Sequence, residues 1–316
     1  MQPKIDLIIP VLFSKRGHLA ALVRSIGLQN LDGIDSVTIT FVINPARPTD
    51  VIDLSNQLRA IVKEKPQFQI QMMTLEKPGV NSARQLGLDS TTGAFVFFFD
   101  DDVQIANPNL IQTHIAHHTN TPDIFAVGGY YSSPQSSRLF AELYLNRQIQ
   151  WLNESYTDFS KTRSNYLIGG HFSVKRSLLQ KHQIKFDTQI VFGSSETDFF
   201  LSARQKGLEL MLIKNSVLHT IKDSPFNLIL KVYKQGSGKR YIETKGLSFS
   251  PKFRSIQQPH SRSARLIHSL FQASFSWGYF AFDRNYAGFF KFYGNHFTLF
   301  LKYQKQKWIN YLRNDF

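Results

Sequence analysis

Apolar and polar positions divide the first 220 residues into a regular succession of strand-like and helix-like segments. Apolar, β-rich strands are predicted at 4–11, 36–43, 68–75 and 94–99, and amphipathic helices at 18–30, 51–65 and 82–90. This succession predicts an α/β fold with a mostly parallel sheet and helices on both faces. In such sheets ligands bind at the carboxyl ends of the strands.

Three consecutive aspartates end the fourth predicted strand. Val96 to Phe99 show no alternation of apolar and polar residues, which is typical of a strand buried on both faces. Asp100, Asp101 and Asp102 then repel one another unless a cation, a ligand or water compensates. The segment is either a solvated acidic turn or a metal or ligand site. Its place at the carboxyl end of a strand favours the site.

Two later segments combine a short strand with a Gly-Gly pair. They are IFAVGGYY at 124–131 and NYLIGGHFSV at 165–174. Adjacent glycines indicate backbone that approaches another group closely, or a plain tight turn.

Four motifs occur in a fixed order along the chain. They are IIPV in the first strand, KPGVNSARQLGL before the fourth, FFFDDDVQI after it, and FGSSETDFFLSARQKG near residue 200. In this order the chain resembles the family 2 glycosyltransferases with the GT-A fold, over about residues 4–220. The resemblance implies a nucleotide-sugar-binding and catalytic domain at 1–223, and we expect residues 224–316 to form a helical, basic, aromatic-rich extension.

The resemblance implies a divalent cation, Mn²⁺ or Mg²⁺, held at the aspartates. Asp102 would ligate the metal, Asp100 would face the ribose or the water shell of the metal, and His219 would complete the metal shell. Such a cation offsets the charge that develops on the diphosphate as the sugar leaves, and hard oxygen ligands suit it. His219 could equally be a satisfied histidine at a strand end.

A general base is implied at a helix start near residue 196. The family usually carries an acidic pair there, and the matching residues are Ser195, Glu196, Thr197 and Asp198. We predict Glu196 as the base that takes the proton of the acceptor hydroxyl, with Asp198 as the rival. The alternative is that these acids only complement the helix dipole.

The matched motifs also imply residues around the donor and the acceptor. Arg84 corresponds to an arginine near the diphosphate, where a guanidinium can pair with phosphate oxygens. The other donor-side residues are predicted to be Pro10, Lys77, Asp101 and Gly170, and the acceptor-side residues Gly169 and His171.

Two departures from the family pattern limit the specificity that can be read. Asn44 stands at the end of the second strand, where the family usually has an aspartate that reads the nucleobase, so the identity of the donor's nucleobase stays open. The Q-x-x-R-W signature of processive synthases is absent, which favours addition of a single sugar to a glycan or lipid-linked acceptor, with cell-surface polysaccharide synthesis as the expected setting.

Charge sets the end of the chain apart. The net charge is +14, of which +12 falls after residue 224, and fourteen aromatic residues lie between Phe271 and Tyr303. Residues 263–303 are therefore predicted to contact an anionic membrane surface, and the alternative is packing on the core or in an oligomer interface. No apolar run is long enough to span a bilayer. We expect a cytoplasmic protein, peripheral on the inner face of the cell membrane.

Several other classes are disfavoured. The chain has no cysteine, which excludes disulfides, thiolate catalysis and Cys-ligated zinc. No nucleic-acid-binding signature accompanies the basic aromatic tail. A nucleotidyltransferase would usually have a glycine-rich loop after the first strand, where VLFSKRGH has one glycine. A non-catalytic nucleotide- or glycan-binding relative of a transferase is the remaining alternative, since Asn44 and Ser195 depart from the family pattern.

Overall fold

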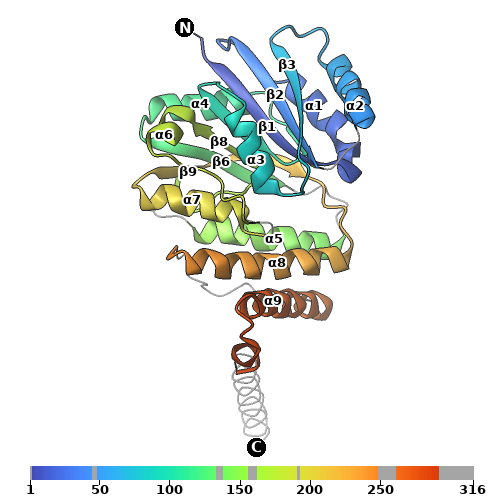
Figure 1. Ribbon diagram of the computed structural model, residues 1–316, viewed down its shortest axis with the longest axis vertical. Coiled ribbons are helices and arrows are strands. Elements are labelled where there is room, and N and C mark those ends of the chain that lie inside the picture. Colours follow the sequence, from blue (N-terminus) through green and yellow to red (C-terminus); the bar gives the residue numbers. More distant parts are fainter. Residues whose placement is uncertain are drawn as a thin grey trace, which may run out of the picture.

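Within residues 2–44, 48–132, 138–155, 162–190, 193–247 and 261–291, which the computed structural model describes, the chain forms a nine-stranded sheet covered by helices (Figure 1). The strand order is β3-β2-β1-β4-β8-β6-β9-β5, and β7 pairs with β9. The strands are β1 (Lys4–Leu12), β2 (Ser36–Asn44), β3 (Phe68–Thr74), β4 (Phe95–Phe99), β5 (Val103–Gln104), β6 (Ile124–Ser132), β7 (Arg163–Ser164), β8 (His171–Lys175) and β9 (Glu209–His219).

Helices connect most of these strands, and the elements predicted up to residue 99 are all present. The helices are η1 (Phe13–His18), α1 (Leu19–Gly27), α2 (Pro48–Ile61), α3 (Val80–Asp89), α4 (Leu110–Asn120), α5 (Leu139–Glu154), α6 (Arg176–Lys181), α7 (Ser195–Gln205), α8 (Pro225–Thr244) and α9 (Arg262–Phe282). The α/β prediction is therefore confirmed.

The first half of the sheet is parallel and the second half is mixed. β1 pairs in parallel with β2 and β4, and β2 with β3, so these four strands end at the same edge of the sheet, where β4 leads into the aspartates. β8 runs antiparallel between β4 and β6, while β6 and β9 are parallel. Val96 to Phe99 are all fully buried, as their unbroken apolar run predicted.

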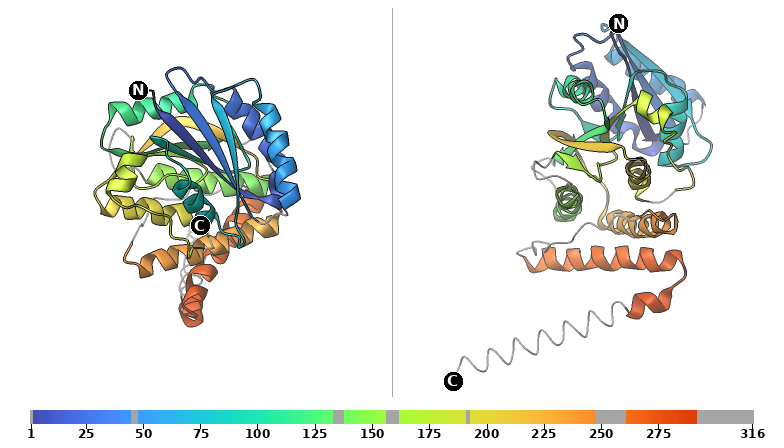
Figure 2. Two further views of the ribbon diagram at one scale, coloured as in Figure 1. Left: turned by 45° about the horizontal axis from the view of Figure 1, so that its top comes forward. Right: turned by 90° about the vertical axis from the view of Figure 1, so that its left-hand side faces the viewer.

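Alternating side chains on β8 separate the two faces of the sheet. Phe172 packs against Phe199 and Phe200 of α7, with ring centroids 6.2 and 5.0 Å away. Its neighbour His171 points the other way, toward His114 of α4, as expected for successive residues of a strand. Figure 2 shows α4 and α7 on opposite sides of the sheet.

The last two described long helices pack on α5 and on each other. Leu228 and Val232 of α8 and Phe271 of α9 form one apolar cluster with residues of α5. The two helices cross closely because a Cβ at Gly236 or Gly278 would overlap a backbone carbonyl of the other helix. The predicted helical extension is confirmed for Pro225–Thr244 and Arg262–Phe282, and Figures 1 and 2 show α9 beyond α8, on the side away from the sheet.

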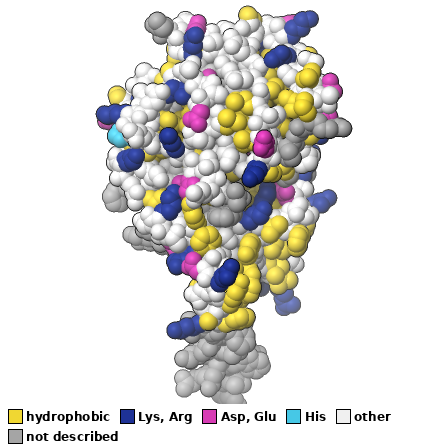
Figure 3. Space-filling view, in the orientation of Figure 1, with side chains coloured by type: hydrophobic (Ala, Val, Ile, Leu, Met, Phe, Trp, Pro, Cys, Tyr) yellow, Lys and Arg dark blue, Asp and Glu magenta, His cyan; other side chains and the backbone are white. Residues whose placement is uncertain are grey.

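The outer side of α9 exposes apolar side chains. Leu266, Leu270 and Trp277 are 63%, 41% and 37% exposed, and Figure 3 shows hydrophobic side chains gathered over this end of the molecule, with Lys and Arg beside them. In the described part of the chain, no helix has both the length and the apolar character needed to cross a bilayer.

Candidate active site

Asp100, at the end of β4, is held by three other elements. Its Oδ1 accepts a hydrogen bond from Nη2 of Arg84 at 3.2 Å, and its Oδ2 accepts one from the Tyr131 hydroxyl at 3.0 Å. Its backbone N–H donates to the carbonyl of Gly170 at 3.3 Å. The carboxylate of Asp100 is therefore fixed in position by α3, β6 and the segment before β8.

Asp102 and His219 form a second pair at the same edge of the sheet. Oδ1 of Asp102 lies 3.2 Å from Nε2 of His219, and β5 pairs with β9 directly beside them. The His219 ring packs on Tyr131 with centroids 4.4 Å apart, which links this pair to Asp100. A carboxylate and an imidazole are ligands that Mn²⁺ accepts. Among the described residues, however, no three acidic or histidine side chains lie close enough together to hold an ion by themselves.

Glu196 lies in the first turn of α7 with both carboxylate oxygens hydrogen-bonded. The Tyr166 hydroxyl donates to Oε1 at 2.8 Å, and the Ser195 hydroxyl donates to Oε2 at 3.0 Å. Arg84 Nη1 in turn lies 3.4 Å from Ser195 Oγ. Hydrogen bonds thus connect Glu196 through Ser195 and Arg84 to Asp100 and Tyr131, and ring packing continues this network from Tyr131 to His219.

Two glycines make this arrangement possible. A Cβ on Gly169 would lie 2.9 Å from Nη2 of Arg84 and 3.1 Å from Glu196, and a Cβ on Gly170 would overlap both Asp100 and the Tyr131 hydroxyl. Gly169 also accepts a 2.8 Å hydrogen bond from Arg84 through its carbonyl. The close approach predicted for this glycine pair is confirmed, whereas the donor-side and acceptor-side roles of the two glycines stay predictions.

The two tyrosines of the network remain protonated hydrogen-bond donors. Burial, reinforced by the charge of Asp100, raises the pKa of Tyr131 well above its usual value. Burial and the neighbouring Glu196 do the same for the pKa of Tyr166. Each tyrosine therefore presents an O–H group to a carboxylate throughout the physiological pH range.

Asp198 lies two residues after Glu196 but has a different environment. Its side chain is buried, and Oδ1 forms an ion pair with Nζ of Lys245, which also lies 3.1 Å from Asp187. Burial raises the pKa of Asp198 even though Lys245 opposes the shift. This aspartate connects α7 to the residue that follows α8, and its partner Lys245 lies outside the network around Glu196.

His171 is not brought into that network. Its fully buried ring lies on the α4 side of β8, with Nε2 3.2 Å from Nε2 of His114. Ser173 Oγ lies 2.8 Å from Nδ1 of His114 and 2.9 Å from Nε2 of His118, so three histidines share one buried cluster. The acceptor-side role of His171 stays a prediction that none of these contacts supports.

The remaining predicted residues surround the ends of the first strands. Asn44 ends β2 beside Leu12, and its buried Oδ1 has no hydrogen-bond partner among the described residues. Asp101 Oδ2 accepts a 3.3 Å hydrogen bond from the backbone N–H of Leu12, so it fixes the end of β1. Pro10 is half-buried in β1, and Lys77 is exposed in the loop before α3.

Sequence reasoning missed the residues that hold the carboxylates in place. Tyr131 directly follows the first Gly-Gly pair on β6, and Tyr166 precedes the second pair by two residues. Tyrosines beside glycine pairs were the available signal, but only the fold shows that their hydroxyls reach Asp100 and Glu196. Ser195 was read as a missing acid, whereas its hydroxyl hydrogen-bonds the acid that follows it.

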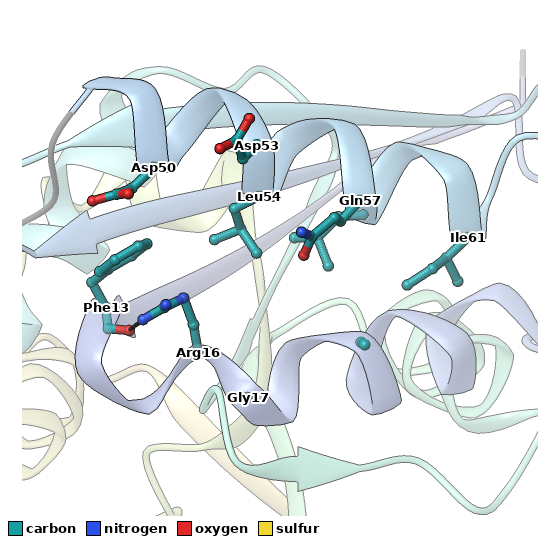
Figure 4. Close-up of a pocket in the computed structure, with 10 residues that line it drawn as sticks. Phe13, Arg16, Gly17, Asp50, Asp53, Leu54, Gln57 and Ile61 are labelled. Atoms are coloured by element: carbon teal, nitrogen blue, oxygen red, sulfur yellow. Dashed lines mark hydrogen bonds between the residues drawn. The ribbon is translucent and has the colours of Figure 1, made fainter.

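A separate hollow of about 410 Å³ lies between η1 and α2. Figure 4 shows Phe13 and Arg16 on one side of it and Asp50, Asp53 and Gln57 on the other. The Arg16 side chain is held over the Phe13 ring and donates to the Phe13 carbonyl at 3.1 Å. None of the predicted site residues lines this hollow.

Comparison with known proteins bears on the family and the fold of the chain. Residues 51–183 match the family model described as Glycosyl transferase family 2. The comparison with curated proteins gave no match. Among solved structures, the chain is similar to a mannosyltransferase, PcManGT from Pyrobaculum calidifontis in complex with GDP-Man and Mn²⁺, with a TM-score of 0.56 and 13% identity, over 91% of this chain and 75% of that one.

A second structure, described only as a mycobacterial protein, has a TM-score of 0.53 and 15% identity, over 78% of this chain and 76% of that one. These identities establish the fold alone, and the family match supplies the class of reaction. Over residues 51–183 the chain therefore matches the family 2 glycosyltransferases, enzymes that transfer a sugar from a nucleotide-sugar, and its fold is GT-A-like.

Proposed function

We propose that this enzyme transfers a single sugar with inversion, in a metal-dependent reaction, with Glu196 as the general base. The observation that carries the proposal is the network that connects Glu196 with Asp100 through hydrogen bonds of Ser195 and Arg84, and Asp100 with His219 through Tyr131. This network joins Glu196, the proposed base, to Asp100 at the end of β4, where the donor would bind.

In this reaction Glu196 accepts the proton of an acceptor hydroxyl. The hydroxyl oxygen then bonds to the anomeric carbon of the sugar, and the bond from that carbon to the leaving phosphate oxygen breaks, with its electron pair going to the nucleoside diphosphate. Tyr166 and Ser195 hold the two oxygens of Glu196, so the base is oriented before the acceptor arrives. Asp198 is engaged by Lys245 and is the weaker candidate for the base.

The residues that would hold a divalent cation are Asp102 and His219, with Asp100 beside them. Two protein ligands fit a cation that takes its remaining ligands from water and from the diphosphate of the donor. When bound, the cation supplies positive charge to the departing diphosphate. The similar mannosyltransferase structure, which contains GDP-Man and Mn²⁺, supports the same class of donor and metal here.

Asn44 is the residue we assign to the nucleobase. Its buried Oδ1 lacks a partner among the described residues, and an amide oxygen can accept a hydrogen bond from a ring N–H of uracil, thymine or guanine. The donor nucleotide is therefore a choice between these bases rather than a presumed UDP.

We further propose a catalytic domain at 1–223 and a membrane-facing extension at 224–316, acting on a glycan or lipid-linked acceptor in cell-surface polysaccharide synthesis. The outer side of α9 supports the membrane-facing extension. Arg262 and Arg265 are exposed in its first turn, and the aromatic Trp277 is exposed farther along. Aromatic and basic side chains together favour the headgroup region of an anionic, cytoplasmic-face membrane. Residues 292–303 of the predicted membrane segment lie outside the described residues.

The test is calorimetry of the purified protein with UDP, GDP, dTDP and CMP, with Mn²⁺ or with EDTA. We expect one nucleoside diphosphate to bind with Mn²⁺, and the binding to be lost with EDTA and in Asp102→Asn. With the matching nucleotide-sugar, Glu196→Gln should lower kcat by about 10²- to 10⁴-fold while nucleotide binding is retained. Metal-independent binding, or a Glu196→Gln enzyme with unchanged kcat, would contradict the proposal.

A further inference from the structure

Arg147 on α5 differs from Arg84, Arg163 and Arg176 in how its charge is compensated. Arg84, Arg163 and Arg176 each form an ion pair within 3.2 Å, to Asp100, Glu209 and Asp6 respectively. Among the residues that the structure describes, no carboxylate pairs with Arg147, and its solvent-shielded Nη1 has no hydrogen-bond partner. Burial lowers the pKa of Arg147 to about 10, so the guanidinium still carries its charge at neutral pH.

Aromatic rings hold this guanidinium in place. Its Cζ lies 5.5 Å from the ring centroid of Trp151 and 5.0 Å from that of Phe275, and the two rings are perpendicular. Contacts with aromatic faces stabilise a cation only partly, whereas a shielded charge without a counter-ion is costly. The arrangement therefore favours an anion beside Arg147.

The space next to Arg147 leads to the proposed base. Arg147, Gln148, Trp151, Gln235 and Glu196 line one small cavity between α5, α7 and α8, whose volume of about 20 Å³ admits a single oxygen-sized group. The Oε1 of Gln148 is also buried without a partner in the described part of the chain. The Nε2 of Gln235 donates to the Tyr144 hydroxyl at 3.2 Å, which fixes the opposite wall.

We propose that Arg147 forms a subsite for an anionic group of the acceptor, a phosphate or a carboxylate, beside the hydroxyl that Glu196 deprotonates. An oxygen of that group would enter the cavity and accept hydrogen bonds from the guanidinium, and Gln148 would accept one from a neighbouring hydroxyl. The role as an acceptor subsite rests on the proposed function of Glu196. Because Phe275 belongs to α9, the C-terminal helices help to build the subsite.

Trp151 provides a direct reporter of this subsite. In a Trp277→Phe, Trp308→Phe background it is the only tryptophan, and its ring contacts the Arg147 guanidinium. We would titrate this protein with inorganic phosphate and, separately, with acetate, at constant ionic strength set by chloride. We expect a saturable change in Trp151 fluorescence with one of the two anions. A response to phosphate would indicate a phosphorylated acceptor, and a response to acetate a carboxylated one.

The same titration in Arg147→Gln should require at least about tenfold more anion, because a hydrogen bond to a charged group is lost. The matched control is Arg240→Gln, since Arg240 also lies over an aromatic ring, that of Tyr279, but is paired with Asp283. Its anion response should equal that of the parent protein.

Two results would overturn the subsite: no response to either anion, or an equal response in Arg147→Gln. Calorimetry of Arg147→Gln with the nucleoside diphosphate and Mg²⁺ is run in parallel. Unchanged nucleotide binding shows that the variant is folded and the donor site intact, while weakened binding would move Arg147 to the donor side and refute the assignment. If the parent protein bound no nucleotide but kept an Arg147-dependent anion response, the proposed function would fail and the anion site would stand.

Discussion

Lowering the pH should destabilise the protein through its buried histidine cluster. His114, His118 and His171 are fully buried around Ser173. Neutral rings satisfy the chain of contacts with one proton each: His118 donates to Ser173, Ser173 to His114, and His114 to His171. Burial, with a smaller contribution from the charge of Lys175, lowers the pKa of His118 to about 3, and burial lowers that of His171 to about 3 as well.

The direction of the effect follows from these two pKa values. Below pH 6.5 the unfolded chain binds protons at both rings while the folded protein does not, so the free energy of unfolding falls as the pH falls, until about pH 3. Between pH 7 and pH 5 each ring contributes a loss of about 2 kcal/mol, and the two together about 4 kcal/mol. Burial and its histidine neighbours lower the pKa of His114 too, which acts in the same direction. A loss of this size is a large share of the about 5–15 kcal/mol that stabilises a typical protein.

Urea unfolding at pH 7 and pH 5, at one ionic strength, measures the effect. Carboxylates also contribute to the pH dependence, so the informative comparison uses His118→Gln, whose amide nitrogen can replace Nε2 in the hydrogen bond to Ser173 without titrating. This variant should lose about 2 kcal/mol less than the parent protein on acidification. His182→Gln, outside the cluster, is the control and should behave like the parent. Equal losses in His118→Gln and the parent would refute the reasoning.

Two further predictions concern the candidate site. Gly170→Ala should abolish nucleotide binding measured by calorimetry and lower the free energy of unfolding by about 1–3 kcal/mol, because a Cβ there overlaps two side chains of the site; normal nucleotide binding would show that the close approach is dispensable. Asp198→Asn should lower the free energy of unfolding by about 1–3 kcal/mol, since it weakens a hydrogen bond to a charged group while Lys245 keeps Asp187 as a partner. It should leave the pH profile of kcat unchanged, and an altered profile would favour Asp198 over Glu196 as the base.

The strands and their chemistry could be predicted because both are local properties of the sequence. Val96 to Phe99 are apolar without interruption, and that pattern requires a strand covered on both faces. The sequence also placed Asp100 at the end of that strand, where the structure has it. The sequence left a close approach or a plain tight turn open for Gly170, and the structure shows the close approach.

The partners of these residues could not be predicted, because they depend on which distant segments meet. Arg84 was expected at a phosphate, yet its hydrogen bonds go to Asp100, Gly169 and Ser195, which are 16, 85 and 111 positions away in sequence. Asp198 and Glu196 look equivalent in the sequence. Only the position of Lys245, brought to α7 by the end of α8, distinguishes a paired aspartate from the base candidate.

The contacts of the C-terminal helices could not be predicted from the sequence either, and they bear on the division of the chain into a domain and an extension. Charge and aromatic content separate residues 224–316 from the rest of the chain, and this contrast suggests an appendage. In the structure, α8 contributes Gln235 to the cavity beside Glu196, and α9 contributes the Phe275 ring that holds Arg147. The apolar outer side of α9 and the Phe275 ring that contacts Arg147 belong to one helix. A membrane surface contacting the outer side would therefore lie in a fixed relation to the proposed acceptor subsite, which is the geometry that an anionic, lipid-linked acceptor requires.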